Sequence, residues 1–379
     1  MVTWLPVSLL KPFRALRYDP ERAGSLDRLV APPYDVVTPE LRADLLAASP
    51  YNAVRLVRPD APDEAAQELA AWQAEGVLVR DEEPATWVLE ETFVGPDGFE
   101  RTRVGLVARV RLEPYATGHI LPHERTFPGP KEARLRLLRA TRTKLSPILL
   151  LHEGASPVVP ACRPDMEAAF GGARSRLWRI DDQGLLEAVG GHIVIADGHH
   201  RYETALRFHE EDGSPETSHV LAALVARDDP GLVIFATHRL VHGVVPELNG
   251  RFRMTEVAGG ASEALKRLEE LPRDHPAFAL VRPGRTILAE IDAEGPGPLA
   301  ALDTTALDRL PFGEVEFTAN AADAERAVSE GRAEAAYLVR PPTVQQVEAV
   351  ALAGDTMPQK STYFFPKLTS GLLFSPFDE

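Results

Sequence analysis

The densest group of chemically capable side chains lies in one short segment, Asp197-Gly198-His199-His200-Arg201. It follows an apolar run typical of a buried strand and precedes residues with helical spacing, so we expect it at a helix N-terminus. Unpaired N–H groups and the helix dipole favour anions there, and Arg adds charged donors.

We therefore predict that Gly198, His199 and Arg201 bind a nucleotide or phosphate. Asp197 is predicted to hold Mg²⁺ or to orient a neighbouring histidine, and His200 is counted with the catalytic residues. An alternative stays open, in which both histidines have structural roles at the helix start and Arg201 pairs with an acid.

A second group lies upstream, between His119 and Arg134. Pro130 suits the first turn of a helix that runs to about Thr143. Residues 125–144 hold seven basic residues and a single acidic one. Most of these arginines are expected to form a solvated helix face, whereas the residues near the loop are predicted to function: Glu124 as catalytic base, Lys131 and Arg134 as phosphate ligands, and His123 as a substrate contact.

The C-terminal region offers a third group, Lys360-Ser361-Thr362. A lysine beside two hydroxyls could contact a substrate phosphate, and it could equally form a surface turn. We keep both readings and count the three residues as candidate substrate contacts.

Other chemistries are disfavoured by the pattern. His119 and His123 are four apart, but Gly118 and Pro122 argue against one helix carrying both, so a transition-metal site is not expected. The single cysteine, Cys162, cannot form an internal disulfide or a cysteine-based zinc site. The common glycine-rich nucleotide motifs and the G-x-S-x-G motif of hydrolases are absent from the sequence.

The net charge of the chain limits the kinds of binding partner that we expect. The formal charge is 41 − 56 = −15, which disfavours binding to nucleic acid or to anionic membranes. The start of the chain lacks a secretory pattern and the apolar stretches are too short to span a bilayer, so we expect a cytoplasmic protein. The expected partner is a small-molecule phosphate or a hydroxy amino acid, and we allow for a homodimer.

The elements that must position these groups alternate between strands and helices, which predicts a mixed α/β (α+β) fold. Residues 54–57 are predicted as a strand and residues 63–75 as a helix capped by Asp60 or Asp63. Two hairpins are expected, around Pro96-Asp97-Gly98 and Pro283-Gly284. We predict three units: residues 1–115, a core over 116–245, and residues 246–379, which end in the Lys-Ser-Thr loop.

With these motifs assembled, the sequence resembles the domain-of-unknown-function 1015 family along nearly its whole length. The resemblance rests on four segments together: Ala31-Pro-Pro-Tyr-Asp35, His123-Glu124 with Gly129-Pro-Lys131 and Arg134, residues 197–203, and Met357-Pro-Gln-Lys-Ser-Thr362. The middle region is also similar to the fold shared by ParB nucleotide-binding domains, sulfiredoxin and the archaeal free-serine kinase. This resemblance implies a central ParB/sulfiredoxin-like nucleotide-binding core with flanking N- and C-terminal α/β units.

The resemblance and the residues together lead to a functional hypothesis. The protein is predicted to be a nucleotide-dependent phosphotransferase that uses ATP or ADP with Mg²⁺ and acts on a small hydroxyl compound. Free serine or phosphoserine is the best guess, in either direction. The alternatives are a non-catalytic ParB-like nucleotide-binding switch module and, more weakly, a phosphoserine-type phosphatase or a DNA-binding protein.

Overall fold

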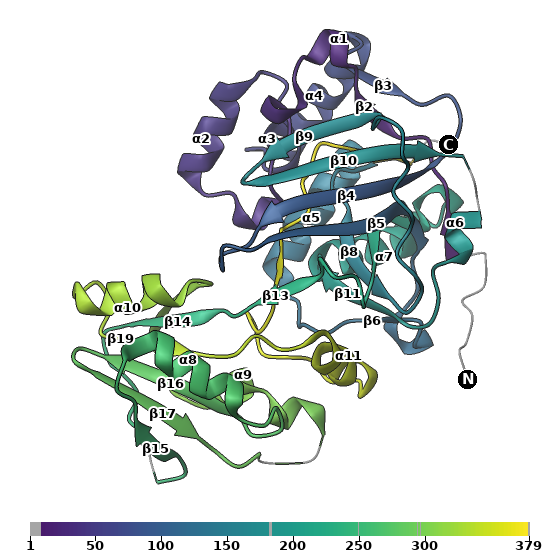
Figure 1. The fold of residues 1–379 in the computed structure, drawn as a ribbon. Helices are drawn as coiled ribbons and strands as arrows, with labels where there is room; N and C mark the ends of the chain where they lie inside the picture. Colours follow the sequence, from purple (N-terminus) through teal and green to yellow (C-terminus); the bar gives the residue numbers. More distant parts are fainter. Residues whose placement is uncertain (1–8, 182–183, 249, 294, 296, 378–379) are drawn as a thin grey trace.

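The computed structural model describes residues 9–181, 184–248, 250–293, 295 and 297–377. Within these residues two main sheets and the helices around them form a mixed α/β fold, which confirms the predicted class (Figure 1). The larger sheet has nine strands in the order β6 (Ile120–Leu121), β11 (Ile193–Asp197), β8 (Ile148–His152), β12 (His219–Ala226), β5 (Glu100–Arg111), β4 (Thr86–Val94), β10 (Ala173–Ile180) and β9 (Met166–Phe170), with β1 (Leu10–Lys11) beside β5.

Two apolar cores cover the two faces of this sheet. In β12, Leu221, Ala223 and Val225 belong to one core, while the alternate residues Val220 and Leu224 belong to the other. Successive side chains of a strand point to opposite faces, so a strand that is buried on both sides is apolar throughout. The same reason explains the continuous apolar run in β11, which ends at the candidate site.

Helices surround the two sheets, and two of them form the walls of the site. Helix α5 (Pro128–Thr141) packs against α7 (His199–Asp212) through Leu135, Leu138 and Phe208. The other helices are α1 (Pro20–Ala23), α2 (Pro39–Ala48), α3 (Val54–Val57), α4 (Pro62–Ala74), α6 (Gly184–Glu187), α8 (Gly260–Glu270), α9 (Asp303–Leu307), α10 (Ala321–Ser329) and α11 (Val344–Leu352).

Local predictions were confirmed where turn chemistry is strong. Strands β4 and β5 pair antiparallel across residues 96–98, and the hairpin around residues 283–284 also forms. The predicted strand at residues 54–57 is wrong, because this segment is helix α3. Asn52 accounts for the difference: its side chain accepts a hydrogen bond from the Val54 N–H at 2.9 Å and so starts a helical turn. Helix α4 begins after Ala61, which has no side-chain cap, so the predicted cap at Asp60 or Asp63 is wrong too.

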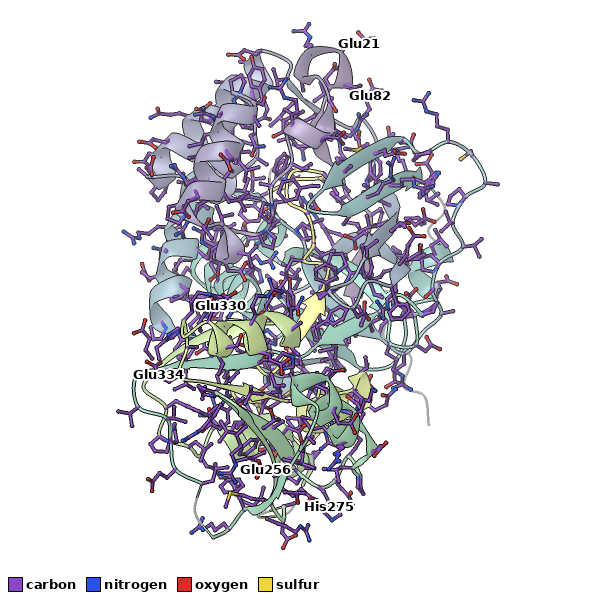
Figure 2. The ribbon with its side chains drawn as sticks, turned by 60° about the vertical axis from the view of Figure 1, so that its left-hand side comes forward. Glu21, Glu82, Glu256, His275, Glu330 and Glu334 are labelled. Atoms are coloured by element: carbon purple, nitrogen blue, oxygen red, sulfur yellow. The ribbon has the colours of Figure 1, made fainter. Side chains whose placement is uncertain are left out.

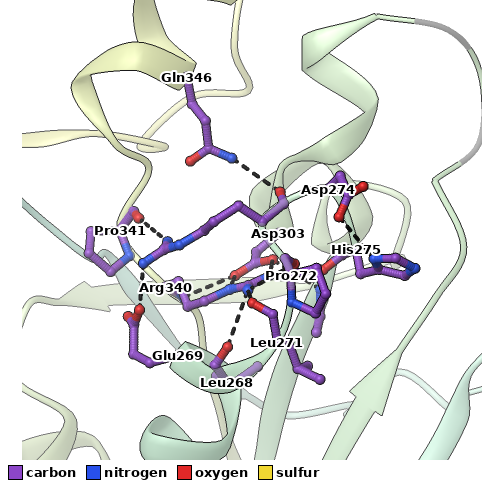
Figure 3. Close-up of polar contacts among 12 residues, drawn as sticks. Leu268, Glu269, Leu271, Pro272, Asp274, His275, Asp303, Arg340, Pro341 and Gln346 are labelled. Atoms are coloured by element: carbon purple, nitrogen blue, oxygen red, sulfur yellow. Dashed lines mark hydrogen bonds and ion pairs between the residues drawn. The ribbon is translucent and has the colours of Figure 1, made fainter.

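The second sheet has six antiparallel strands: β15 (Arg253–Glu256), β17 (Arg285–Glu290), β16 (Ala277–Arg282), β19 (Ala335–Leu338), β14 (His238–His242) and β18 (Glu314–Thr318). A buried ion pair joins Arg340, two residues after the end of β19, to Asp303, the first residue of α9, at 2.7 Å. Figure 3 shows the Arg340 guanidinium among backbone carbonyls, and it donates to those of Leu268, Leu271, Pro272 and His275.

The C-terminal segment, residues 357–377, returns from the second sheet to the first (Figure 1, yellow). Its strand β20 (Tyr363–Phe365) pairs with β13 (Val233–Phe235), and β21 (Ser375–Pro376) pairs with β7 (Thr143–Lys144). Buried Arg103 on β5 holds the segment by donating to the carbonyls of Phe365 and Pro366 while it pairs with Glu91 at 2.6 Å. The remaining two-stranded pair joins β2 (Leu16–Tyr18) to β3 (Leu78–Arg80).

The nine-stranded sheet takes strands from both sides of residue 115. Segments assigned to the first two predicted units therefore share one sheet, and the three-unit division remains a prediction. Labelled acidic residues such as Glu21, Glu82 and Glu256 lie exposed on the outside of the molecule (Figure 2). Across the residues that the structure describes, no helix is both long enough and apolar enough to cross a membrane.

Candidate functional site

The site begins at the turn that joins β11 to α7. Asp197 ends the strand, Gly198 is the N-cap of the helix, and His199 is its first residue. Gly198 has a φ of 98°, and a Cβ at this position would lie 2.6 Å from Cγ2 of Ile148. Glycine is therefore required both by the backbone conformation and by the close packing. The N-cap makes no side-chain hydrogen bond, which leaves the first N–H groups of α7 open to an anion.

Asp197 lies between two cations. One carboxylate oxygen accepts from Arg201 at 2.7 Å, and the other accepts from Lys367 of the C-terminal segment. Burial alone would raise the pKa of Asp197, but the charges of Lys367 and Arg201 outweigh burial and lower the pKa to about 2. Burial likewise opposes the charge on Lys367, yet Asp197 raises the pKa of that lysine overall. Both groups are thus ionised near neutral pH.

Two of the predicted histidines, His123 and His199, are buried and joined by a hydrogen bond. His123 donates from Nδ1 to the Ile195 carbonyl at 2.6 Å, so its Nε2 accepts from the Thr362 hydroxyl at 3.0 Å. Its backbone N–H donates to Nε2 of His199 at 3.2 Å. Burial lowers the pKa of His123 to about 4 and also lowers that of His199.

His200 also contacts the upstream loop. Its Nε2 accepts the backbone N–H of Phe127 at 3.0 Å, and burial lowers its pKa. Each histidine of the turn therefore has one ring nitrogen engaged by the loop, while Arg201 pairs with Asp197. These contacts match the structural alternative stated above, and the catalytic and phosphate-binding roles of the two histidines remain predictions.

Glu124 is the available carboxylate of the site. It is half-buried, and its backbone forms a bridge to Met357 at the start of the C-terminal segment. No hydrogen bond or ion pair of its carboxylate was found among the described residues. Burial raises its pKa, although the charges of Lys360 and Lys367 act in the opposite direction. A partly desolvated carboxylate of raised pKa suits a general base.

The predicted phosphate ligands on α5 already have protein partners. Lys131 pairs with Glu203 of α7 at 2.9 Å, and Thr126 donates to the same carboxylate oxygen at 2.6 Å. Arg134 donates to the Val57 carbonyl at 2.7 Å, and its guanidinium stacks over the Tyr34 ring at 4.1 Å. A phosphate would have to share or replace the contacts of Lys131.

The predicted C-terminal contacts separate into different roles. Thr362 reaches the site through His123. Ser361 is buried and donates to Thr304 and to the Pro358 carbonyl, which fixes the loop. Lys360 is exposed with a φ of 57°, and its charge acts on Glu124.

Sequence reasoning missed Lys367, Glu203, Tyr34 and Asp35 as members of the site. The charge of Asp35 acts on Glu124, His200 and Lys367. A signal for the residues near the N-terminus was present, because the Ala-Pro-Pro-Tyr-Asp segment was one of the four that carried the family resemblance. Its place beside the β11–α7 turn could not be derived from the sequence.

The residues present fit a phosphate group better than a metal ion. The open helix N-terminus and nearby Arg201, Lys360 and Lys367 provide donors and positive charge. Both carboxylate oxygens of Asp197 already contact cations, so it does not fit the predicted role of a magnesium ligand. Among the described residues, no three His, Cys, Asp or Glu side chains are grouped so that they could hold a metal ion.

Comparisons with known proteins give one family and several distant structural similarities. The model of the family described as "Protein of unknown function (DUF1015)" matches residues 10–305. No protein with a curated description matches the chain. A structure titled "Free serine kinase in complex with AMP" is 15% identical, with a TM-score of 0.41 over 71% of this chain and 91% of that one.

Two further structures are similar at the same level. A conserved hypothetical protein from Pyrococcus furiosus is 13% identical, with a TM-score of 0.39 over 72% of this chain and 96% of its own. A C-terminally truncated SbnI from Staphylococcus aureus is also 13% identical, with a TM-score of 0.39 over 72% of this chain and 87% of its own. Similarity at this level carries no conclusion about function, which must come from the residues of the site.

Proposed function

This chain belongs to the family described as "Protein of unknown function (DUF1015)", and from the residues of its site we propose that it is a nucleotide-dependent phosphotransferase. The substrate is a small hydroxyl compound or its phosphate ester, with free serine as acceptor or phosphoserine as donor as the best guess, and the nucleotide is ATP or ADP. The direction of transfer follows from the relative concentrations of the two substrates, because the same groups serve both directions.

In the kinase direction, Glu124 accepts the proton of the substrate hydroxyl. The hydroxyl oxygen forms a bond to the terminal phosphorus of the nucleotide, and the bond from that phosphorus to the leaving oxygen breaks. In the reverse direction Glu124 returns the proton. Catalysis of this kind depends on positioning and on neutralising the charge of the transferred group.

The cations around Glu124 would supply that neutralisation. The charges of Lys360 and Lys367 already act on Glu124. Arg201, in the first turn of α7, is held by its ion pair with Asp197. The open N–H groups at the start of α7 would bind a nucleotide phosphate without any side-chain rearrangement. Asp197 would position Lys367 and Arg201, and no step of the reaction uses a metal held by Asp197.

One observation carries the proposal. Glu124 is a half-buried carboxylate of raised pKa, unpartnered among the described residues, and it stands beside cations that come from a distant part of the chain. Burying a charge without a partner is costly, so such a group is more readily explained by chemistry than by stability.

A second candidate, a non-catalytic nucleotide-dependent switch, is favoured by a different observation. The C-terminal segment contributes Lys360, Thr362 and Lys367 to the site while it also pairs with β13 and β7. A ligand that binds these side chains would therefore change how the C-terminal segment packs against β13 and β7. This alternative requires nucleotide binding but not the carboxylate of Glu124.

The test is a transfer assay with isotope-labelled phosphate in both directions. Nucleotides would be combined with serine, threonine and their phosphorylated forms, and nucleotide binding would be measured separately by the shift in melting temperature. Transfer to or from serine supports the proposal. Intact nucleotide binding without transfer in either direction would remove the enzyme and leave the switch.

A further inference from the structure

A cavity of about 70 Å³ lies between helices α5 and α7. Apolar side chains of both helices and of the neighbouring strands form part of its wall, among them Leu137, Leu138 and Ala205. Arg201 and Tyr34 lie at its border with the candidate site described above. Hydroxyl groups add to the lining: Tyr34, Thr141, Thr143, Ser146 and Thr204.

Lys144 lines the same cavity and has an unusual environment. Its side chain is buried, and the Nζ atom has no hydrogen-bond partner among the described residues. The Nζ atom lies 4.6 Å from the centre of the Phe377 ring. Burial, together with the nearby charge of Arg109, lowers the pKa of Lys144 to about 7. An unsatisfied buried amine is destabilising unless something else supplies an acceptor.

The charges around the cavity have one sign. Among the described residues that line it, the charged ones are Arg134, Lys144 and Arg201. The charge of Arg201 is balanced by Asp197, but Arg134 and Lys144 form no ion pair with any described residue. Arg134 also has a buried Nε that forms no hydrogen bond within the part of the chain that the structure describes.

We propose that this cavity is a binding site for a single phosphate-sized oxyanion, in which Lys144 and Arg134 supply the charge and the hydrogen-bond donors. A tetrahedral oxyanion accepts several hydrogen bonds at once, which suits the Lys144 amine and the Arg134 Nε, neither of which has a hydrogen-bond partner among the described residues. The cavity is less than half the size of the roughly 150 Å³ cavity that binds benzene, so it suits such a group better than an aromatic base.

The inference needs neither a nucleotide nor turnover, so it stands or fails apart from the proposed function. The anion could be free phosphate or the phosphate of a larger ligand that reaches in past Arg201. Competition separates these sources. ADP would displace phosphate if the group belongs to the nucleotide, O-phosphoserine if it belongs to the substrate, and neither would do so if the ligand is free phosphate.

The experiment measures the binding of inorganic phosphate by calorimetry and by the shift in melting temperature, at constant ionic strength. It compares the unmodified protein with Lys144→Met, which removes the amine and keeps the length of the side chain. Lys144→Gln serves as a second variant in case the first does not fold. Lys266→Met is the matched control, because this lysine is exposed on helix α8, which packs against the second sheet.

We expect phosphate to bind the unmodified protein and Lys266→Met equally. The dissociation constant should rise at least about tenfold in both Lys144 variants, as expected for the loss of a charge-assisted hydrogen bond. The proposal is overturned if phosphate at about 10 mM binds none of these proteins, or if the Lys144 variants bind it as tightly as the control.

Discussion

Asp197 illustrates how one residue links the two ends of the chain. Its two oxygens contact Arg201, four residues away, and Lys367, which is 170 residues away. The short-range contact could be inferred from the sequence, since an acid four residues before an arginine at a helix start is a common pair. The long-range contact could not, because nothing local to Lys367 specifies its partner.

Replacing Asp197 with Asn should destabilise the protein by about 3 kcal/mol. The substitution leaves two partly buried cations without their acidic partner, which destabilises the folded protein more than removing both members of an ion pair would. Chemical denaturation would measure the loss. The double variant Asp197→Asn/Lys367→Met should recover part of it, and additive losses would contradict the coupling between the two residues.

Acid should reveal the same contact. The folded pKa of Asp197 is about 2 against an ordinary value of 3.8, so the stabilisation is present above about pH 4. It is lost as the pH falls toward 2, by roughly 2–3 kcal/mol. Asp197→Asn should therefore show a smaller loss of stability over this range than the unmodified protein, in unfolding curves recorded at each pH.

Lys144 should also make stability rise with pH, but in the alkaline range. Its folded pKa is about 7 and its ordinary value is 10.5, so the unfolded chain binds a proton that the folded chain lacks between these values. Stability should rise with pH from about 7 to 10. Lys144→Met should flatten this rise, and an unchanged slope would show that Lys144 is not the group responsible.

At the scale of elements, the strand–turn–helix that carries residues 193–212 was predictable because its signals are local. A β-branched run, a glycine and a helical apolar pattern follow one another without conflict. The prediction of a strand at residues 54–57 was wrong because the local signal there is weak. A four-residue segment with three apolar residues does not distinguish a strand from a helix, and the deciding contact comes from the Asn52 side chain.

Gly198→Ala tests this turn directly. The added Cβ would meet Ile148 within 2.6 Å and would also strain the backbone, so we expect a loss of about 2–3 kcal/mol and weaker nucleotide binding. Gly213→Ala is the matched control, since Gly213 ends the same helix with a φ of 71° and open space around it. It should cost about 1 kcal/mol and leave binding intact. Equal effects of the two variants on binding would show that the turn does not contact the ligand.

At the scale of the whole molecule, the sequence predicted the class and many of the elements but not their assembly. The β4–β5 hairpin was correctly predicted, yet its membership in the sheet of the site depends on pairing with β12 and β10, far along the chain. The C-terminal segment gave no sign that it returns to the N-terminal region, where Ser370 pairs with Ala31. Such non-local pairings are set by the packing of complete elements rather than by any local pattern.

The second sheet is likewise stabilised by contacts between residues that are far apart in the sequence. Arg340 is buried and joins Asp303 to the loop after α8 (Figure 3). Arg340→Met should destabilise the protein by about 3–5 kcal/mol, because it leaves Asp303 buried without its partner. Denaturation followed by tryptophan fluorescence and by circular dichroism would measure the loss, and a loss below about 1 kcal/mol would contradict this role.

The central claim is that Glu124 performs chemistry at a site built from four distant segments. The most direct test measures the rate of phosphoryl transfer and the nucleotide dissociation constant for Glu124→Gln. Glu132→Gln, an exposed acid on the adjacent helix, is the control. We predict that Glu124→Gln slows transfer by about 10²–10⁴-fold while nucleotide affinity is retained, and that the control matches the unmodified protein. Undiminished transfer by Glu124→Gln would contradict the account.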